Sequence, residues 1–165
     1  MTRRISIFIF SALTALCLWN CDQAKKPNEN PKQEINELPY LNYQTLSGEP
    51  SSTRSLPGSS ILILFNTDCD HCQREAKEIA EKYDAFKSYE LLFIAADSVH
   101  QIEKFAKTYN LAGKTKVKFG RAEYQDVFMN FGSIPTPAIY VYSRERKFVK
   151  SFMGETPVEE LIKHL

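Results

Sequence analysis

The sequence predicts an α/β domain in which a central mixed β-sheet is flanked by helices. Two observations lead to this prediction. Patterns typical of buried strands alternate with helical patterns along most of the chain after residue 38, as they do in α/β folds. The last two strand patterns, residues 138–142 and 148–153, are separated only by a short charged turn. They are therefore close enough to form an antiparallel hairpin, which makes the sheet mixed.

Strands are expected where apolar residues form a short run between turn residues. The run ILILF, residues 61–65, lies between Pro57-Gly58 and Asn66 and has the pattern of a central strand that is buried on both faces. The other expected strands are residues 41–46, 91–96, 117–119, 138–142 and 148–153.

Helices are expected where apolar residues recur every three or four positions or where capping residues occur. Apolar residues have this spacing from Ala76 to Phe86. Ser98 and Gln101 form a capping box for a helix that runs toward Tyr109. Residues 123–131 are also expected to be helical.

A final helix is expected near the C-terminus. Thr156 would be its N-cap, Pro157 its first-turn proline and Glu159 its capping-box acid.

Residues 1–20 have the features of an export signal. Arg3 and Arg4 precede an apolar run from Ile5 to Leu18, which is shorter than the roughly 18 apolar residues of a membrane-spanning helix. The sequence LWNC, residues 18–21, resembles the lipobox of bacterial lipoproteins, in which the signal is cut before a cysteine that becomes diacylated. This resemblance implies a lipid on Cys21; an uncleaved anchor and a plain secretory signal are the alternatives.

The chain is expected to have three parts: a lipoprotein signal peptide (1–20), a disordered membrane tether (21–37) and one globular domain (38–165). After Cys21, the tether is polar and contains two prolines, a composition that cannot bury enough apolar surface to fold. Loss of residues 1–20, which include two arginines and no acid, changes the net charge from +1 to −1. Nucleic acid is therefore not an expected partner. The expected location is a bacterial cell envelope, with the domain lipid-anchored and facing the periplasm or exterior.

The cysteines indicate a reactive pair in the globular domain. Cys17 would leave with the signal and Cys21 would carry lipid, so only Cys69 and Cys72 remain of the four cysteines. A disulfide between them closes a loop so short that it would stabilise the fold little. In an oxidising compartment, such a pair is expected to be reactive rather than structural.

Cys69 is expected directly after a buried strand and at the start of a helix. Unpaired backbone N–H groups and the helix dipole favour a thiolate there, and the thiolate is the attacking species in disulfide exchange. Cys69 is therefore the predicted nucleophile, and Cys72 the buried thiol that resolves the mixed disulfide.

The strand ILILF, the sequence NTDCDHC and the amphipathic helix that follows resemble the thioredoxin fold. More narrowly, the domain from about residue 38 is similar to the membrane-tethered, extracytoplasmic TlpA-like thiol-disulfide oxidoreductases. This resemblance implies that CDHC is the CxxC motif and that Glu75 assists proton transfer. The segment 136–154 resembles the family's proline, strand, turn, strand and glycine. It implies that Pro137, rather than the alternative Pro135, is the cis-proline and that the backbone of Thr136 faces the dithiol.

Residues around the motif differ from the family's pattern. Asp68 replaces the usual aromatic residue before the first cysteine, and Asn66-Thr67 replaces a tryptophan-containing stretch. Asp68 and Asp70 should oppose a thiolate, whereas a protonated His71 should favour it, so the direction of electron flow is left open. His71 has a second interpretation, as a solvated loop residue without a role in the reaction. Glu75 also has a second interpretation, as an acid in the first turn of the helix that only balances the helix dipole.

The predicted function is reduction of protein disulfides outside the cytoplasm through the dithiol and a mixed disulfide. The resemblance implies no cofactor beyond a redox-active Cys69–Cys72 disulfide. Expected partners are protein thiols or disulfides, the membrane through lipid on Cys21, and an upstream membrane electron donor if the protein is a reductase. The alternative function is copper or zinc binding and delivery, although no bound metal is expected for the leading hypothesis. A peroxidase is disfavoured because no proline-threonine-cysteine site occurs.

Overall fold

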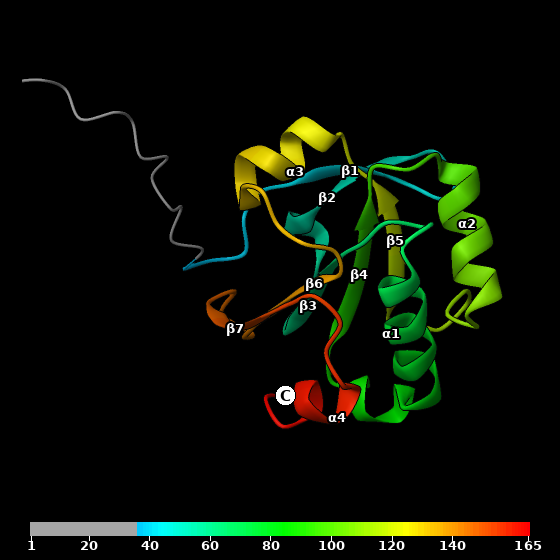
Figure 1. Ribbon diagram of the computed structural model, residues 1–165. Coiled ribbons are helices and arrows are strands. Elements are labelled where there is room, and N and C mark those ends of the chain that lie inside the picture. Colours follow the sequence, from blue (N-terminus) through cyan, green and yellow to red (C-terminus); the bar gives the residue numbers. More distant parts are fainter. Residues whose placement is uncertain (1–35) are drawn as a thin grey trace, which may run out of the picture. The chain divides into compact units, whose positions relative to one another are not determined.

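The computed structural model describes residues 36–165, which form a sheet with helices on both faces (Figure 1). The expected signal peptide, Cys21 and nearly all of the expected tether lie outside the described residues. The strands are β1 (Asn42–Thr45), β2 (Pro50–Ser52), β3 (Ser60–Leu64), β4 (Glu90–Ala95), β5 (Val117–Arg121), β6 (Ala138–Tyr142) and β7 (Phe148–Met153). The helices are α1 (Asp70–Glu81), α2 (Val99–Thr108), α3 (Tyr124–Phe131) and α4 (Val158–Ile162), with 3₁₀ turns η1 (Thr53–Ser55) and η2 (Tyr83–Phe86).

The seven strands form one mixed sheet in the order β2-β1-β5-β4-β3-β6-β7. The central strand β3 pairs in parallel with β4 and antiparallel with β6. β6 and β7 form the expected antiparallel hairpin. The predicted mixed sheet is thus confirmed, and the carboxyl ends of β3 and β4 meet at one edge, where the two loops that follow them lie close together.

Every residue of β3 is buried, because both faces of the sheet are covered. Ile61 and Ile63 point into a core shared with α1, α2 and α4. Leu62 and Leu64 point into a second core shared with α3 and with residues near the start of the domain. This arrangement explains the uninterrupted apolar run. Figure 1 shows α1 and α2 on one side of the sheet and α3 on the other.

The C-terminal helix starts differently from the prediction. Pro157 occupies the N-cap position of α4, and the helix has no side-chain cap, so the predicted N-cap role of Thr156 is wrong. Thr156 instead donates its hydroxyl to the carbonyl of Gly154 (3.2 Å) and its backbone N–H to the side chain of Glu75 (3.1 Å). A contact with α1, which is remote in sequence, has replaced a local one. The capping box of Ser98 is present as predicted.

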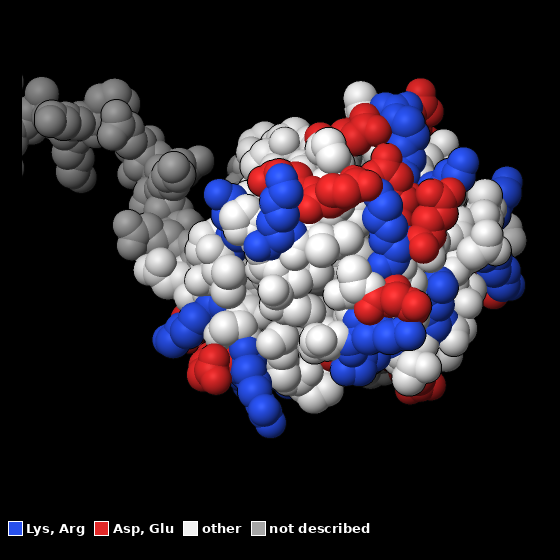
Figure 2. All heavy atoms as spheres, turned by 90° about the horizontal axis from the view of Figure 1, so that it is seen from below, with Lys and Arg blue, Asp and Glu red and all other residues white. Residues whose placement is uncertain are grey.

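Acidic and basic side chains are interspersed on the face of the molecule seen in Figure 2, and no large field of one sign lies there. Some charged side chains form ion pairs between neighbouring elements, such as Lys82 at the C-terminal end of α1 with Glu159 of α4. Within residues 36–165, no helix is both long and apolar enough to cross a membrane.

Candidate active site

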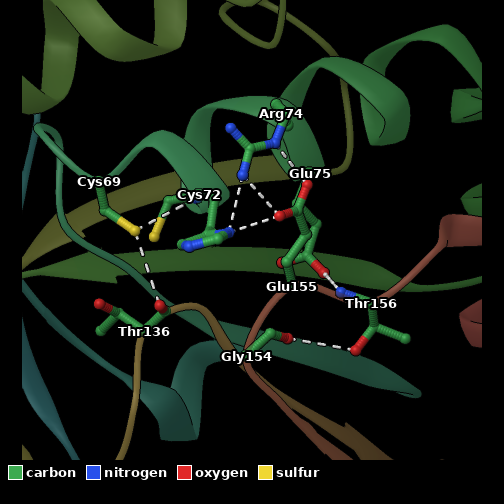
Figure 3. Close-up of polar contacts among 9 residues, drawn as sticks. Cys69, Cys72, Arg74, Glu75, Thr136, Gly154, Glu155 and Thr156 are labelled. Atoms are coloured by element: carbon green, nitrogen blue, oxygen red, sulfur yellow. Dashed lines mark hydrogen bonds and ion pairs between the residues drawn. The ribbon is translucent and has the colours of Figure 1, made fainter.

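Cys69 forms the N-cap of α1, directly after the strand β3 and the short loop that follows it. Its backbone is extended, and its sulfur accepts a hydrogen bond from the backbone N–H of Cys72 at 3.4 Å. The Cys69 thiol is partly exposed and lies 3.6 Å from the carbonyl oxygen of Thr136, to which it donates (Figure 3). A sulfur that caps a helix receives both an N–H donor and the positive end of the helix dipole, and both favour negative charge on it.

Cys72 differs from Cys69 in burial, since it is only 3% exposed. Burial, together with a hydrogen bond to Cys69, raises the pKa of the Cys72 thiol well above its ordinary value. Both cysteines are present as free thiols. The two sulfurs are therefore unequal: Cys69 is accessible to a substrate, whereas Cys72 is held protonated behind it.

The loop before Cys69 is fixed by Asp97, which follows β4. The carboxylate of Asp97 accepts hydrogen bonds from the backbone N–H and the hydroxyl of Thr67, at 3.3 and 2.9 Å. The side chain of Gln73 donates to the carbonyl of Thr67 at 3.0 Å. These contacts fix the entry into α1. The sequence analysis did not select Asp97, although its position directly after a strand parallel to β3 was a usable signal.

The peptide bond between Thr136 and Pro137 is cis, and it is the only cis bond in the described part of the chain. The choice of Pro137 over Pro135 as the cis-proline is thus confirmed. Pro137 is buried and Thr136 is exposed. Cys69 and Thr136 are brought together as expected, while a role of Thr136 and Pro137 in substrate binding stays a prediction.

Glu75 lies one turn after Cys72 on the buried side of α1 and is 2% exposed. Its Oε1 accepts from the backbone N–H of Thr156, and its Oε2 has no hydrogen-bond partner within residues 36–165. Burial, assisted by the negative charges of Glu155 and Glu78, raises the pKa of Glu75 to about 7. A carboxyl group with such a pKa can gain or lose a proton near neutral pH.

His71 belongs to a cluster with Arg74 and Glu155, and Figure 3 shows the contact between Arg74 and Glu155. Arg74 binds Glu155 through two hydrogen bonds of 2.7 Å, and the His71 Nδ1 lies 2.5 Å from Glu155 and 2.7 Å from Arg74. His71 is exposed, as its second interpretation had it, but it lies in α1 rather than in a loop, and it is not free of contacts. The sequence analysis missed Arg74 and Glu155. Arg74 lies three residues after His71 on the same helix, which is a usable signal; Glu155 gives none.

A cavity of about 370 Å³ lies beside Thr136, between α3 and the carboxyl ends of β3 and β4. Its lining includes polar Asn66 and Thr136 and the aromatic rings of Tyr124 and Phe128. Both aromatic residues are exposed. An apolar hollow thus begins at the residue whose carbonyl contacts the Cys69 sulfur. In the described chain, no three His, Cys, Asp or Glu side chains are grouped as a metal site would require.

Comparisons with known proteins agree with this geometry. Residues 35–150 match the AhpC/TSA family. The thiol-disulfide oxidoreductase ResA of Bacillus cereus is 24% identical over 143 residues, which cover 84% of this chain and 80% of that protein. A secreted disulfide oxidoreductase of Mycobacterium tuberculosis, described as homologous to DsbE of E. coli, has a TM-score of 0.60 at 21% identity and covers 75% of this chain and 92% of its own. ScoI of Arabidopsis thaliana, solved with copper bound, has a TM-score of 0.62 at 18% identity over 76% of this chain and 92% of its own. The predicted thioredoxin-like fold is confirmed, and the chain belongs to the AhpC/TSA family.

Proposed function

We propose that this protein is a thiol-disulfide oxidoreductase that reduces protein disulfides outside the cytoplasm. The observation that carries the proposal is the asymmetry of the two thiols at the start of α1. Cys69 is accessible and its sulfur accepts the N–H of Cys72, whereas the Cys72 thiol is buried and has a raised pKa. The names of relatives such as ResA support the same activity.

The reaction proceeds in two exchanges, and no cofactor beyond the pair itself takes part. The Cys69 thiolate attacks one sulfur of the substrate disulfide, forms a mixed disulfide and releases the other substrate sulfur as a thiolate. Cys72 then loses its proton and attacks the Cys69 sulfur. The second substrate thiolate leaves, and a Cys69–Cys72 disulfide forms. Two electrons pass from the pair to the substrate, and the two released thiolates take up protons.

Glu75 and the Thr136–Pro137 segment assist these steps. Because the Cys72 thiol is buried, its proton needs an acceptor nearby, and Glu75, one turn further along α1, has a pKa of about 7. Pro137 has no N–H, and the backbone of exposed Thr136 lies next to the attacking sulfur. An extended substrate segment can pair with that backbone while its disulfide reaches Cys69.

The proposal is tested by disulfide exchange with oxidised glutathione in the full chain carrying Cys17→Ser and Cys21→Ser, which leaves only the proposed pair as thiols. Cys69→Ser should abolish exchange. Cys72→Ser should stop after the first exchange and accumulate glutathione on Cys69, which mass spectrometry detects. Full activity of Cys69→Ser would refute the mechanism, and absence of the mixed disulfide in Cys72→Ser would refute the role of Cys72.

The direction of electron flow is decided by the reduction potential of the pair, measured in glutathione or dithiothreitol buffers. A value near roughly −270 mV, as in thioredoxin, supports a reductase that receives electrons from an upstream membrane donor. A value near or above about −180 mV supports an oxidant or isomerase instead.

The proposed location is a bacterial cell envelope, where lipid on Cys21 would hold the domain at the membrane and residues 22–37 would serve as its tether. The LWNC sequence supports lipidation, and the secreted relative from Mycobacterium tuberculosis supports a location outside the cytoplasm.

Copper or zinc delivery is the second candidate, and the copper-bound neighbour from Arabidopsis thaliana is the observation that favours it. Cys69, Cys72 and His71 would supply soft ligands. However, the Nδ1 of His71 already contacts Glu155 and Arg74. Metal content that is the same in the wild type and in a Cys69→Ser/Cys72→Ser variant would reject this candidate.

A further inference from the structure

The mechanism above does not use the cluster of His71, Arg74 and Glu155. Its first two members lie in the first turns of α1, shortly after Cys69, and Glu155 contacts both of them. Glu155 comes from the loop between β7 and α4, 84 residues from His71. Its carboxylate is 32% exposed and receives both hydrogen bonds of the Arg74 guanidinium. A bidentate arginine–carboxylate contact has a fixed geometry, unlike most surface ion pairs.

The imidazole of His71 is held by the same contact. A single Nδ1 can donate a proton to Glu155 or accept one from Arg74, but it cannot do both at once. In either state, this nitrogen is held by the cluster, so the ring of a residue that is exposed at the start of α1 has one orientation. Glu155 provides this orientation together with Arg74.

The cluster also determines how much positive charge Cys69 experiences. The bonds from Arg74 and His71 lower the pKa of Glu155 to about 2, so its carboxylate is charged wherever thiols react. The bonds to Glu155 are also the main reason why the pKa of Arg74 is raised, and the charges of Asp70 and Cys69 make smaller contributions in the same direction. Arg74 thus places a positive charge near Cys69, and the carboxylate of Glu155, which binds Arg74 through two hydrogen bonds, offsets part of that charge.

We propose that Glu155 is a positioning residue that keeps the Cys69–Cys72 pair reducing, because it neutralises Arg74 and fixes His71 beside the attacking sulfur. The inference rests on the proposed oxidoreductase function and adds a determinant of its potential. The disulfide takes up two electrons and two protons to give two thiols, or one proton fewer where Cys69 stays a thiolate. Any change that stabilises this thiolate favours the reduced pair and makes the disulfide a stronger oxidant.

The test compares charge-removing variants at both ends of the ion pair. In Glu155→Gln, the positive charge of Arg74 is no longer balanced. The equilibrium constant for reduction of the pair by glutathione should rise about threefold to tenfold, or roughly 15 to 30 mV for a two-electron couple. In Arg74→Gln, the carboxylate of Glu155 is no longer balanced, and the constant should fall. The double variant should return toward the wild type.

These opposite signs separate an electrostatic role from a structural one. Both single variants break the same ion pair, so a purely structural role would shift the potential in the same direction in both, or not at all. Either result would overturn the inference. Glu155→Asp, which keeps the charge, should retain a potential close to that of the wild type.

Glu159→Gln is the matched control. It removes the ion pair of Glu159 with Lys82, the residue that caps the C-terminal end of α1, whereas the cysteines lie at the opposite end of that helix. Its potential should equal that of the wild type. The other charged groups near Cys69, namely Asp68, Asp70 and buried Glu75, are unchanged in all variants. Repeating the comparison in variants that also carry Glu75→Gln excludes any contribution from a change in the protonation of Glu75.

The measurements use the full chain with Cys17→Ser and Cys21→Ser, and melting temperatures identify any variant that fails to fold. A wild-type pair that exchanges with glutathione, combined with unchanged potentials in Glu155→Gln and Arg74→Gln, refutes only the role of Glu155. A wild-type pair that does not exchange refutes the proposed function as well.

Discussion

Glu75 should make the stability of the domain depend on pH in a direction that is unusual for a carboxyl group. It is buried, one of its oxygens has no hydrogen-bond partner among the described residues, and its pKa is raised from 4.5 to about 7. Below pH 4.5 the group is protonated in both the folded and unfolded states and has no effect. As the pH rises toward 7, the unfolded state loses this proton first, so the free energy of unfolding falls.

The size of this effect follows from the shift in pKa. A difference of about 2.5 units corresponds to about 3 kcal/mol at 1.36 kcal/mol per unit. About 2 to 3 kcal/mol of this should be lost between pH 5 and pH 8, because most of the interval between the unfolded and folded pKa values lies within that range. Glu75→Gln removes the titrating group and should remove this loss. The amide oxygen can still accept the N–H of Thr156. Any cost of burying the amide nitrogen is the same at pH 5 and at pH 8.

The assay is urea unfolding at pH 5 and pH 8 of Glu75→Gln and its parent, both carrying Cys69→Ser to remove the accessible thiol. The stability of the variant relative to its parent should increase by about 2 to 3 kcal/mol between these pH values. Glu159 gives the opposite case, since its bond to Lys82 lowers its pKa. Its contribution to stability is therefore lost only as the pH falls below this range, so the stability of Glu159→Gln relative to its parent should stay nearly constant between pH 5 and pH 8. Equal pH dependence in Glu75→Gln and its parent would refute the reasoning.

Two further predictions concern the substrate and the membrane. Tyr124→Ser and Phe128→Ser remove exposed rings that line the cavity beside Thr136. Each substitution should raise KM for a protein disulfide about threefold to tenfold, because it removes roughly 1 kcal/mol of apolar contact with the substrate. Exchange with the smaller glutathione disulfide should stay unchanged. Equal losses with both substrates would argue against a docking role of this cavity. Cys21→Ser should abolish incorporation of labelled palmitate into the protein in its host; unchanged labelling would contradict lipidation at Cys21.

The fold could be predicted largely because its signals are local. The ILILF run is long enough to indicate burial on both faces, and β3 is fully buried. The capping box of Ser98 is complete within four residues and is present. Cys69 follows the ILILF strand and precedes an amphipathic helical pattern, so the sequence also predicted its place at the start of α1, where it forms the N-cap.

The parts of the site that were missed depend on contacts between distant segments. Asp97 holds Thr67 across 30 residues, and Glu155 holds Arg74 across 81. Thr156 has the sequence features of a helix N-cap, yet its N–H binds Glu75. A local pattern gives the preference of a segment in isolation. It cannot show when a buried carboxylate on another element offers a better partner for the same N–H group.

One short segment explains why these contacts occur together. Gly154 adopts a positive φ of 81°, a conformation that costs little only for glycine, and its N–H donates to the carbonyl of Pro137 at 2.8 Å. The next residue, Glu155, binds His71 and Arg74, and Thr156 binds Glu75. Three consecutive residues thus contact the cis-proline, the first turns of α1 and the buried carboxyl group. A change in this loop should therefore alter the potential of the pair and the proton affinity of Glu75 together, which separate substitutions at Glu155 and Glu75 can resolve.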